Sequence, residues 1–165
     1  MELWDLYDKD RKPLGRTHIR GEAFGEGEYY ICCEIWVQNP RGQLLTTKRD
    51  PNKIYGDLWE FVGGGTQAGE NTRQSSVREL FEETGIKVRE EDLSLLVTYT
   101  NKNYFKDIYT VKSDASIASL VLQPGETVDA KWSSFEDIEK MIATGEFVPS
   151  VSQRFHSFRE RLPKA

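Results

Sequence analysis

Three glutamates, Glu79, Glu82 and Glu83, occur close together in a segment that has helical periodicity. At about 100° per residue they fall within one sector of the helix surface, where the i,i+4 pair of like charges is destabilising. Arg78 offsets part of this repulsion by pairing with Glu82 one turn away. Carboxylate oxygens on one helical face suit Mg²⁺, or Mn²⁺ in its place, bound together with a substrate phosphate. The helix alone favours a plainer interpretation, the solvated face of an amphipathic helix.

The helix that carries these glutamates has clear signals at both ends. Asn71 is the expected N-cap with Gln74 as its capping-box partner, and Gly85 is expected to end the helix in a left-handed conformation. Residues 63–65 are glycines, which permit positive φ and close backbone approach to a ligand. The i, i+3, i+4, i+7 spacing predicts a stripe that packs on the core, formed by Val77, Leu80, Phe81 and Thr84.

The whole string from residue 64 to residue 86 follows the pattern G-x5-E-x7-R-E-U-x-E-E-x-G-U, in which U is an aliphatic residue. Its specified positions are Gly64, Glu70, Arg78, Glu79, Leu80, Glu82, Glu83, Gly85 and Ile86. This string resembles the signature of the Nudix hydrolases, and the chain is identified as a member of that family. A match of this length favours a metal site over a merely solvated helix face.

The resemblance implies an α/β fold, a Nudix-type α/β/α sandwich with a mixed central sheet. It also implies an enzyme that hydrolyses the pyrophosphate linkage of a nucleoside diphosphate derivative or a related organic pyrophosphate. In such an enzyme Glu79, Glu82 and Glu83 bind Mg²⁺, and the carbonyl of Gly64 is a further oxygen ligand. Arg78 belongs to the site as a counter-charge that orients the glutamates.

The general base is left open by the sequence. A carboxylate shared between metal ions is a poor base, so Glu79 and Glu126 compete for this role. Glu126 lies in a segment that resembles the downstream end of the Nudix fold, where an acidic residue sometimes completes the metal site or serves as base. Asp129 is the reserve candidate. Glu70 is expected to support Arg78 from the start of the helix.

The composition is that of a globular protein with a charged surface. The chain has 165 residues, 38% hydrophobic and 30% charged, with a net charge of −5, so a single domain (1–165) is expected. The acidic balance argues against a nucleic acid polymer and leaves a small phosphorylated molecule as the expected partner.

Cys32 and Cys33 are expected to be buried free thiols in a reducing, cytoplasmic compartment. No membrane segment is expected, since no apolar run approaches ~18 residues, and the oligomeric state is open, with a homodimer as one alternative.

Residues 1–28 extend beyond what the core of the family requires. Extended pieces at 3–7 and 17–20 predict a β-hairpin packed on the core. The Trp-Asp-Leu-Tyr-Asp start, together with Gly-Arg and Arg-Gly pairs further along, resembles the branch related to isopentenyl-diphosphate isomerase. Those isomerases need a reactive cysteine near the strand end that follows the tryptophan, and residues 59–64 contain none. Isomerase chemistry is therefore the first alternative, and a non-catalytic module that binds a nucleotide or metabolite is the second.

Apolar and β-branched runs bounded by turn residues predict strands at 29–37, 43–48, 58–62, 92–100, 104–112, 117–122 and 128–132. Helices are expected from 71 to 84, from a start within 133–137 to 143, and from 151 to 161. The first two strands are predicted to pair as a hairpin. Glu34 is expected to face the surface, and Lys53 is expected to be solvated. For Arg49, a solvated position in the loop and a contact with a substrate phosphate are equally compatible with the sequence.

Overall fold

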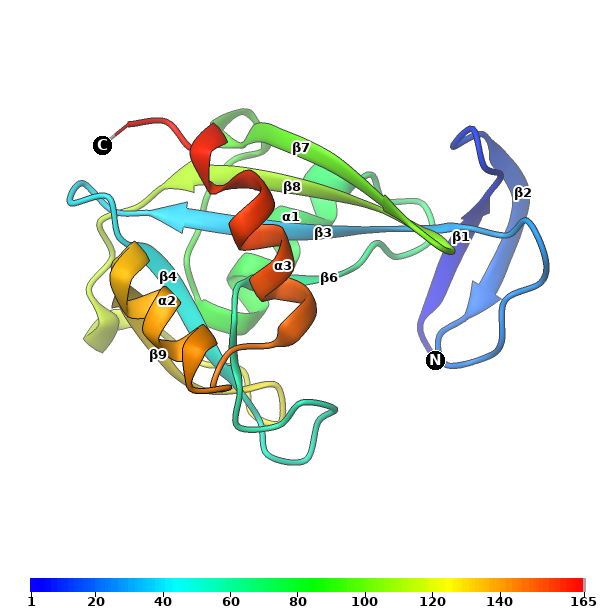
Figure 1. Cartoon of the computed structure of the whole chain (residues 1–165). Coiled ribbons are helices and arrows are strands. Elements are labelled where there is room, and N and C mark those ends of the chain that lie inside the picture. The colour runs from blue at the N-terminus through cyan, green and yellow to red at the C-terminus, as the bar shows by residue number, and fades with distance from the viewer. Residues whose placement is uncertain (165) are drawn as a thin grey trace.

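The computed structural model of the chain describes residues 1–164, and Figure 1 shows the order of its elements. The strands are β1 (Leu3–Tyr7), β2 (Pro13–Ile19), β3 (Tyr30–Gln38), β4 (Leu44–Arg49), β5 (Trp59–Glu60), β6 (Val62–Gly65), β7 (Ser94–Asn101), β8 (Tyr104–Lys112) and β9 (Thr127–Ser133). The α-helices are α1 (Thr72–Thr84), α2 (Phe135–Ala143) and α3 (Pro149–Phe158). Short 3₁₀ turns occupy Glu90–Asp92, Ile117–Ser119 and Arg159–Arg161. Among the described residues, no helix combines the length and the apolar character needed to cross a membrane.

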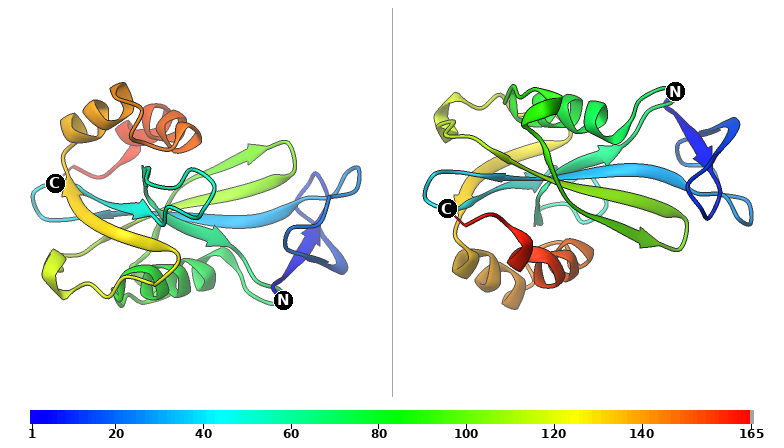
Figure 2. Two further views of the ribbon diagram at one scale, coloured as in Figure 1. Left: turned by 90° about the horizontal axis from the view of Figure 1, so that it is seen from below. Right: turned by 90° about the horizontal axis from the view of Figure 1, so that it is seen from above.

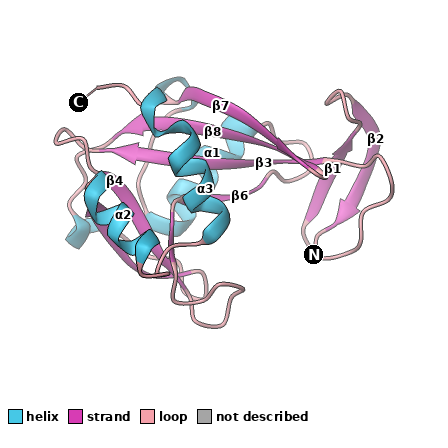
Figure 3. Ribbon diagram, in the orientation of Figure 1, coloured by secondary structure: helices cyan, strands magenta, loops and turns pink. Residues whose placement is uncertain are grey.

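Strand β3 is the centre of a mixed seven-stranded sheet (Figure 3). It pairs in parallel with β8 along its whole length and antiparallel with β6, where Cys33 lies opposite Gly64. Strand β7 continues the sheet beyond β8, while β5 and β9 both pair with β4. Strands β1 and β2 form a separate antiparallel hairpin. The main sheet therefore combines one parallel pair with antiparallel neighbours.

Helices cover both faces of this sheet, with α1 on one side and α2 and α3 on the other (Figure 2). Successive side chains of a strand point to opposite faces, and those of β3 follow this rule. Cys33 and Val37 pack with Leu80 of α1, whereas Trp36 packs with Phe155 of α3. Burial on both faces explains why β3 reads as a nearly continuous apolar run. The predicted α/β/α sandwich with a mixed sheet is confirmed.

The ends of α1 are formed by the predicted residues. The Asn71 side chain accepts hydrogen bonds from the backbone N–H groups of Arg73 and Gln74, and the Gln74 side chain accepts from the Asn71 N–H at 2.9 Å. Gly85 has a φ of 76°, and its N–H donates to the carbonyl of Phe81 at 2.8 Å. Both caps satisfy backbone groups that a helix leaves unpaired.

The face of α1 that packs on the sheet differs from the predicted stripe. Leu80 and Thr84 are fully buried as expected, but Phe81 is 47% exposed. Small polar side chains, Ser75 and Ser76, are fully buried instead. Because small residues let the helix approach the glycine-rich strand β6 closely, the packed face lies partly outside the apolar stripe. The prediction for Phe81 was wrong.

The strand predicted at 117–122 is absent. Residues 117–122 form a 3₁₀ turn and a loop, and the Val121 N–H donates to the carbonyl of Thr84 at 3.0 Å. The segment therefore packs against the end of α1 and does not join the sheet. The predicted hairpin of β3 and β4 is present but short, because the strands pair antiparallel at Gln38 and Leu44 before β4 turns away to pair with β9.

Glu34 is buried in the sheet and does not face the surface as predicted. It is 2% exposed, and its Oε1 accepts a hydrogen bond from the Trp36 indole at 2.9 Å. Its Oε2 accepts from Nε of Arg154, at 3.0 Å, on α3. Burial raises the pKa of Glu34, but its partners, chiefly Arg154 and Lys106, lower it by more than burial raises it. The net shift of the pKa is therefore downward. The carboxylate is thus kept charged inside the protein by a cation from a distant helix.

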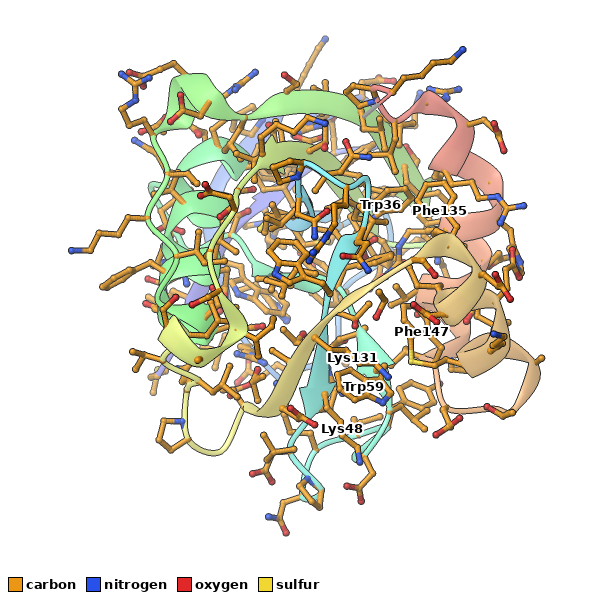
Figure 4. The ribbon with its side chains drawn as sticks, turned by 90° about the vertical axis from the view of Figure 1, so that its left-hand side faces the viewer. Trp36, Lys48, Trp59, Lys131, Phe135 and Phe147 are labelled. Atoms are coloured by element: carbon orange, nitrogen blue, oxygen red, sulfur yellow. The ribbon has the colours of Figure 1, made fainter. Side chains whose placement is uncertain are left out.

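Aromatic and basic side chains anchor the loop between β4 and β5. The ammonium of Lys131 on β9 lies 4.2 Å from the centre of the Trp59 ring, and the two side chains lie together beside Phe147 in Figure 4. Trp59 also bridges to Phe147 through the backbone. These contacts fix the end of the loop that carries Lys53.

Hydrogen bonds along the β1–β2 hairpin attach it to the rest of the chain. Tyr7 and Tyr29 exchange backbone hydrogen bonds of 2.8 and 2.9 Å. Arg11, in the turn of the hairpin, donates to both carboxylate oxygens of Asp107 on β8. The same carboxylate accepts from the Thr72 hydroxyl at the start of α1. A single buried aspartate therefore links the hairpin, the sheet and the first turn of α1.

We expect Leu80→Ala to lower the free energy of unfolding by about 2–5 kcal/mol, because it removes a fully buried side chain. Phe81→Ala is the matched control at the next position, and its cost should stay below about 1 kcal/mol because the ring is half exposed. Urea denaturation followed by circular dichroism measures both values. Equal losses for the two variants would contradict the packing described for α1.

Candidate active site

Strand β6 brings its glycine backbone against α1 and β1 with no room for side chains. A Cβ added at Gly64 would overlap the carboxylate of Glu79, and one added at Gly65 would lie 2.7 Å from the indole of Trp4. Neither glycine has a positive φ, nor does Gly63. Close approach of neighbouring groups therefore explains this run of glycines, and an unusual backbone conformation does not.

A cavity of about 180 Å³, here called the acidic cavity, opens between β6, α1 and the loops that precede β5 and β9. Its wall contains the site residues proposed from the sequence, namely Gly64, Arg78, Glu79, Glu82, Glu83 and Glu126. Asp129, the reserve candidate, lies exposed on β9 and outside this wall. The fold thus brings α1 and a loop more than 40 residues further along the chain to one hollow.

Other residues of the acidic cavity were missed by sequence reasoning. Glu2 and Arg20 reach it from the hairpin, and Gln67 and Gln123 reach it from loops. None of them is a specified position of the string from residue 64 to residue 86, and their positions along the chain are scattered. Only the folded hairpin reveals that the N-terminal extension forms part of the site.

Arg78 joins the turn before α1 to the acidic face of the helix. Its Nε and Nη2 donate to the two oxygens of Glu70 at 2.8 and 2.9 Å. Its Nη1 donates to Oε1 of Glu79 at 2.8 Å and to Oε2 of Glu82 at 3.2 Å, and Nη2 also reaches the carbonyl of Gly65 at 3.2 Å. The guanidinium therefore orients two glutamates while leaving the second oxygen of each outside its hydrogen bonds.

Glu83 is buried more deeply than a solvated helix face would allow, with an exposed fraction of 7%. Burial raises its pKa well above the ordinary value, and the nearby carboxylates of Glu60 and Glu79 raise it further. Burial also raises the pKa of Glu79, although Arg78 opposes the shift. Ionising these carboxylates is costly unless a cation lies beside them.

Lys53 points into the acidic cavity, and the prediction that it is solvated was wrong. Its ammonium forms an ion pair with the carboxylate of Glu126. The loop folds over the site because the Asp50 N–H donates to the carbonyl of Glu126 at 2.9 Å. Arg49, by contrast, pairs with Glu60 at 2.6 Å and lines a neighbouring cavity.

The donor groups of the acidic cavity fit a divalent cation. Within residues 1–164, no three acidic, histidine or cysteine side chains already form a compact ligand cluster. The carboxylates of Glu79, Glu82 and Glu83 instead line one hollow as separate groups. Carboxylate oxygens are the ligands that Mg²⁺ and Mn²⁺ prefer, and a cation would offset the cost of ionising Glu83. These three side chains and the Gly64 carbonyl could hold such an ion.

Residues 33–151 match the sequence profile of the NUDIX domain. An uncharacterized Nudix hydrolase of Listeria monocytogenes is 33% identical over 151 residues, which cover 90% of this chain and 89% of the relative. An isopentenyl-diphosphate Delta-isomerase of Salmonella heidelberg is 24% identical over 144 residues, covering 83% of this chain and 80% of the isomerase.

Solved structures have the same fold. A protein of Deinococcus radiodurans superposes with a TM-score of 0.79 at 23% identity, covering 95% of this chain and 99% of that protein. The NUDIX domain of Shewanella oneidensis NrtR, crystallised with ADP ribose, has a TM-score of 0.66 at 20% identity, covering 88% of this chain and 95% of that domain. The profile match over residues 33–151 and the relative of 33% identity show that the chain belongs to the Nudix family. It is an enzyme of the class of Nudix hydrolases.

The buried carboxylate of Glu83 makes a prediction about stability in the metal-free protein. Because its pKa is higher in the folded than in the unfolded chain, its contribution favours folding at low pH and is lost as the pH rises above the unfolded value of about 4.3. Glu83→Gln should therefore be more stable than the wild type near pH 8, with a difference that vanishes below about pH 4. Denaturation with urea in the presence of a chelator measures this difference.

Gln67→Ala is the control for this experiment, because Gln67 lines the same cavity and carries no ionisable group. Its pH profile of stability should run parallel to that of the wild type. A parallel profile for Glu83→Gln as well would contradict the burial of an ionisable carboxylate at this position.

Proposed function

We propose that the protein uses a divalent metal ion, Mg²⁺ or Mn²⁺, to hydrolyse the pyrophosphate linkage of a nucleoside diphosphate derivative or a related organic pyrophosphate. The observation that carries this proposal is the burial of Glu83 beside Glu79 in a cavity that Glu82 and Glu126 also line. With Glu2, five carboxylates line this cavity, and they would repel an anionic substrate unless a cation lay between them and the substrate. A metal-bound pyrophosphate satisfies that requirement.

Residues of α1 and β6 would hold the metal. Glu79, Glu82 and Glu83 supply carboxylate oxygens and Gly64 supplies its carbonyl, while Arg78 restricts the conformations of the first two side chains. When bound, the metal supplies Lewis-acid chemistry, which offsets charge on phosphate oxygens and lowers the pKa of a water molecule. The protein then contributes mainly positioning and electrostatics, as phosphoryl transfer requires.

Basic side chains of the acidic cavity can bind the phosphates. Lys53 and Arg20 line the same wall as the glutamates, and both can donate hydrogen bonds to phosphate oxygens.

Two carboxylates remain candidates for the general base. Glu126 becomes available when Lys53 turns from it to the substrate, and burial raises the pKa of Glu79 toward the range in which a carboxylate accepts a proton well.

The class of substrate has support from a protein of similar fold. The NUDIX domain of Shewanella oneidensis NrtR was crystallised with ADP ribose, a nucleoside diphosphate linked to a second moiety. We propose that the substrate of this chain belongs to the same class of compound. A net charge of −5 agrees with a small substrate held through a metal.

Isomerase chemistry is the weaker hypothesis despite the isomerase among the relatives. The strand after the tryptophan, residues 59–64, has no cysteine. Cys32 lies near the site, but burial raises the pKa of its thiol, which makes it a poor nucleophile or acid–base group. The complete acidic face of α1 also favours hydrolysis over a module that only binds its ligand.

The state of the two cysteines also indicates the cellular compartment in which the protein works. Cys32 and Cys33 are both buried and free. Adjacent free thiols are typical of proteins that work under reducing conditions. We therefore place the enzyme in the cytoplasm, where it would meet phosphorylated metabolites.

Glu82→Gln should reduce kcat by about 100-fold or more at saturating Mg²⁺. A metal ligand contributes to stabilisation worth several kcal/mol in the transition state, and each 1.36 kcal/mol corresponds to a factor of about ten. The fold should be unchanged by circular dichroism, since the side chain makes no contact with the core. Glu91→Gln, at an exposed position outside the acidic cavity, is the matched control and should keep full activity.

The assay is the Mg²⁺-dependent release of phosphate or nucleoside monophosphate from nucleotide sugars, dinucleoside polyphosphates, oxidised nucleotides and prenyl diphosphates. Wild-type turnover by Glu82→Gln would contradict the role of this residue. Tight binding of one compound without turnover of any would identify a binding module, and double-bond migration in a prenyl diphosphate would identify an isomerase.

A further inference from the structure

A second cavity, of about 350 Å³, lies beside the acidic cavity and is bounded by α3. It is called the basic cavity below. The two cavities share Arg20 and the glycines of β6, so they meet along that strand. The other walls of the basic cavity come from the hairpin, β3 and β8. Its volume falls within the range of small-molecule sites, and none of these other walls belongs to the Nudix signature.

Four basic side chains line the basic cavity, and three of them are paired with carboxylates. The pairs are Arg154–Glu34 at 2.5 Å, Arg49–Glu60 at 2.6 Å and Arg20–Glu2 at 2.7 Å. The fourth basic side chain is Lys106 on β8. The nearest carboxylate on this cavity wall is that of Glu34, which Arg154 already binds at 2.5 Å.

Lys106 is largely buried, with 17% of its side chain exposed, and lies opposite Cys32 in the sheet. Its ammonium is 4.0 Å from the carboxylate of Glu34, beyond hydrogen-bonding distance. That carboxylate already accepts hydrogen bonds from Trp36 and Arg154. Burial raises the pKa of Cys32, so its neutral thiol supplies no counter-charge. Burial lowers the pKa of Lys106, but the surrounding groups, Glu34 among them, raise it by more, and the net shift is upward. Lys106 is therefore a buried cation that shares the single carboxylate of Glu34 with Arg154, and an anionic ligand in the cavity would give it a partner of its own.

The hairpin closes the basic cavity with a stack of aromatic rings. The Trp4 and Tyr30 rings are 4.5 Å apart and nearly parallel, and the Phe24 ring packs against both, 5.1 Å from Tyr30 and 6.3 Å from Trp4. Trp4 also packs on the backbone of Gly65, at the border between the two cavities. A substrate that extends from the acidic into the basic cavity would pass along this rigid wall.

We propose that the basic cavity binds the organic moiety of the substrate, and that Lys106 forms an ion pair with an anionic group on that moiety. The group is a phosphate or a carboxylate outside the pyrophosphate that is cleaved. This inference rests on the proposed function, because the cleaved linkage must lie in the acidic cavity for the moiety to reach Lys106. It narrows the substrate class to organic pyrophosphates that carry an additional anion.

The test uses two pairs of pyrophosphates that differ by one anionic group. UDP-glucuronate and UDP-glucose differ by a carboxylate, and coenzyme A and dephospho-coenzyme A differ by a phosphate. We expect the wild type to prefer the anionic member of at least one pair by about tenfold or more in kcat/KM, as a charge-assisted hydrogen bond would provide. Lys106→Met should remove this preference mainly through KM, and Lys106→Arg should retain most of it.

Lys102→Met is the matched control, because Lys102 is exposed in the turn between β7 and β8 and lines neither cavity. It should leave the preference unchanged. If circular dichroism shows that Lys106→Met is unfolded, Lys106→Gln replaces it.

Hydrolysis without a preference for either anionic member, or a preference that survives the loss of Lys106, would overturn this inference and leave the proposed function standing. If all four compounds are inert, the best substrate of the wider panel is used, and a best substrate without an additional anion also overturns it. Failure of Mg²⁺-dependent hydrolysis for every compound would overturn the proposed function itself, and this inference with it.

Discussion

The acidic site depends on one guanidinium. Arg78 binds both oxygens of Glu70, orients Glu79 and Glu82, and reaches the carbonyl of Gly65. A helix face of like charges is held in one arrangement by these bonds. The same bonds tie the turn before α1 and the end of β6 to the helix, so three segments of the site are positioned by one side chain. The guanidinium forms no hydrogen bond with the deeper carboxylate of Glu83, whose pKa stays raised by burial although Lys53 and Arg49 oppose the shift, and a metal ion would offset the cost of ionising it.

The glycine strand β6 is the second constraint, because it separates two cavities of opposite character. Side chains at Gly64 and Gly65 would collide with Glu79 and Trp4, so neither cavity could keep its present wall. On one side the carboxylates suit a metal and its pyrophosphate. On the other side Lys106 suits an anion. A molecule with a metal-bound pyrophosphate at one end and a free anion at the other would match both environments.

Local features of this site could be predicted from the sequence, whereas features made by distant contacts could not. The start of α1 follows from Asn71, whose hydrogen bonds reach only two and three residues ahead. Helical periodicity placed Phe81 in the core because it takes no account of the glycine strand, against which Glu79 of α1 packs. Glu34 is buried by Arg154, 120 residues along the chain, and Lys53 enters the acidic cavity through a partner 73 residues away. No pattern of neighbouring residues encodes such pairs.

The claim that Glu79, Glu82 and Glu83 share a divalent cation is tested most directly by anomalous X-ray scattering from crystals grown with Mn²⁺. We predict a manganese peak at coordination distance from carboxylate oxygens of these side chains, and its weakening or loss in Glu83→Gln. A peak elsewhere, or none at this position at Mn²⁺ concentrations that support turnover, would contradict the assignment of the metal site.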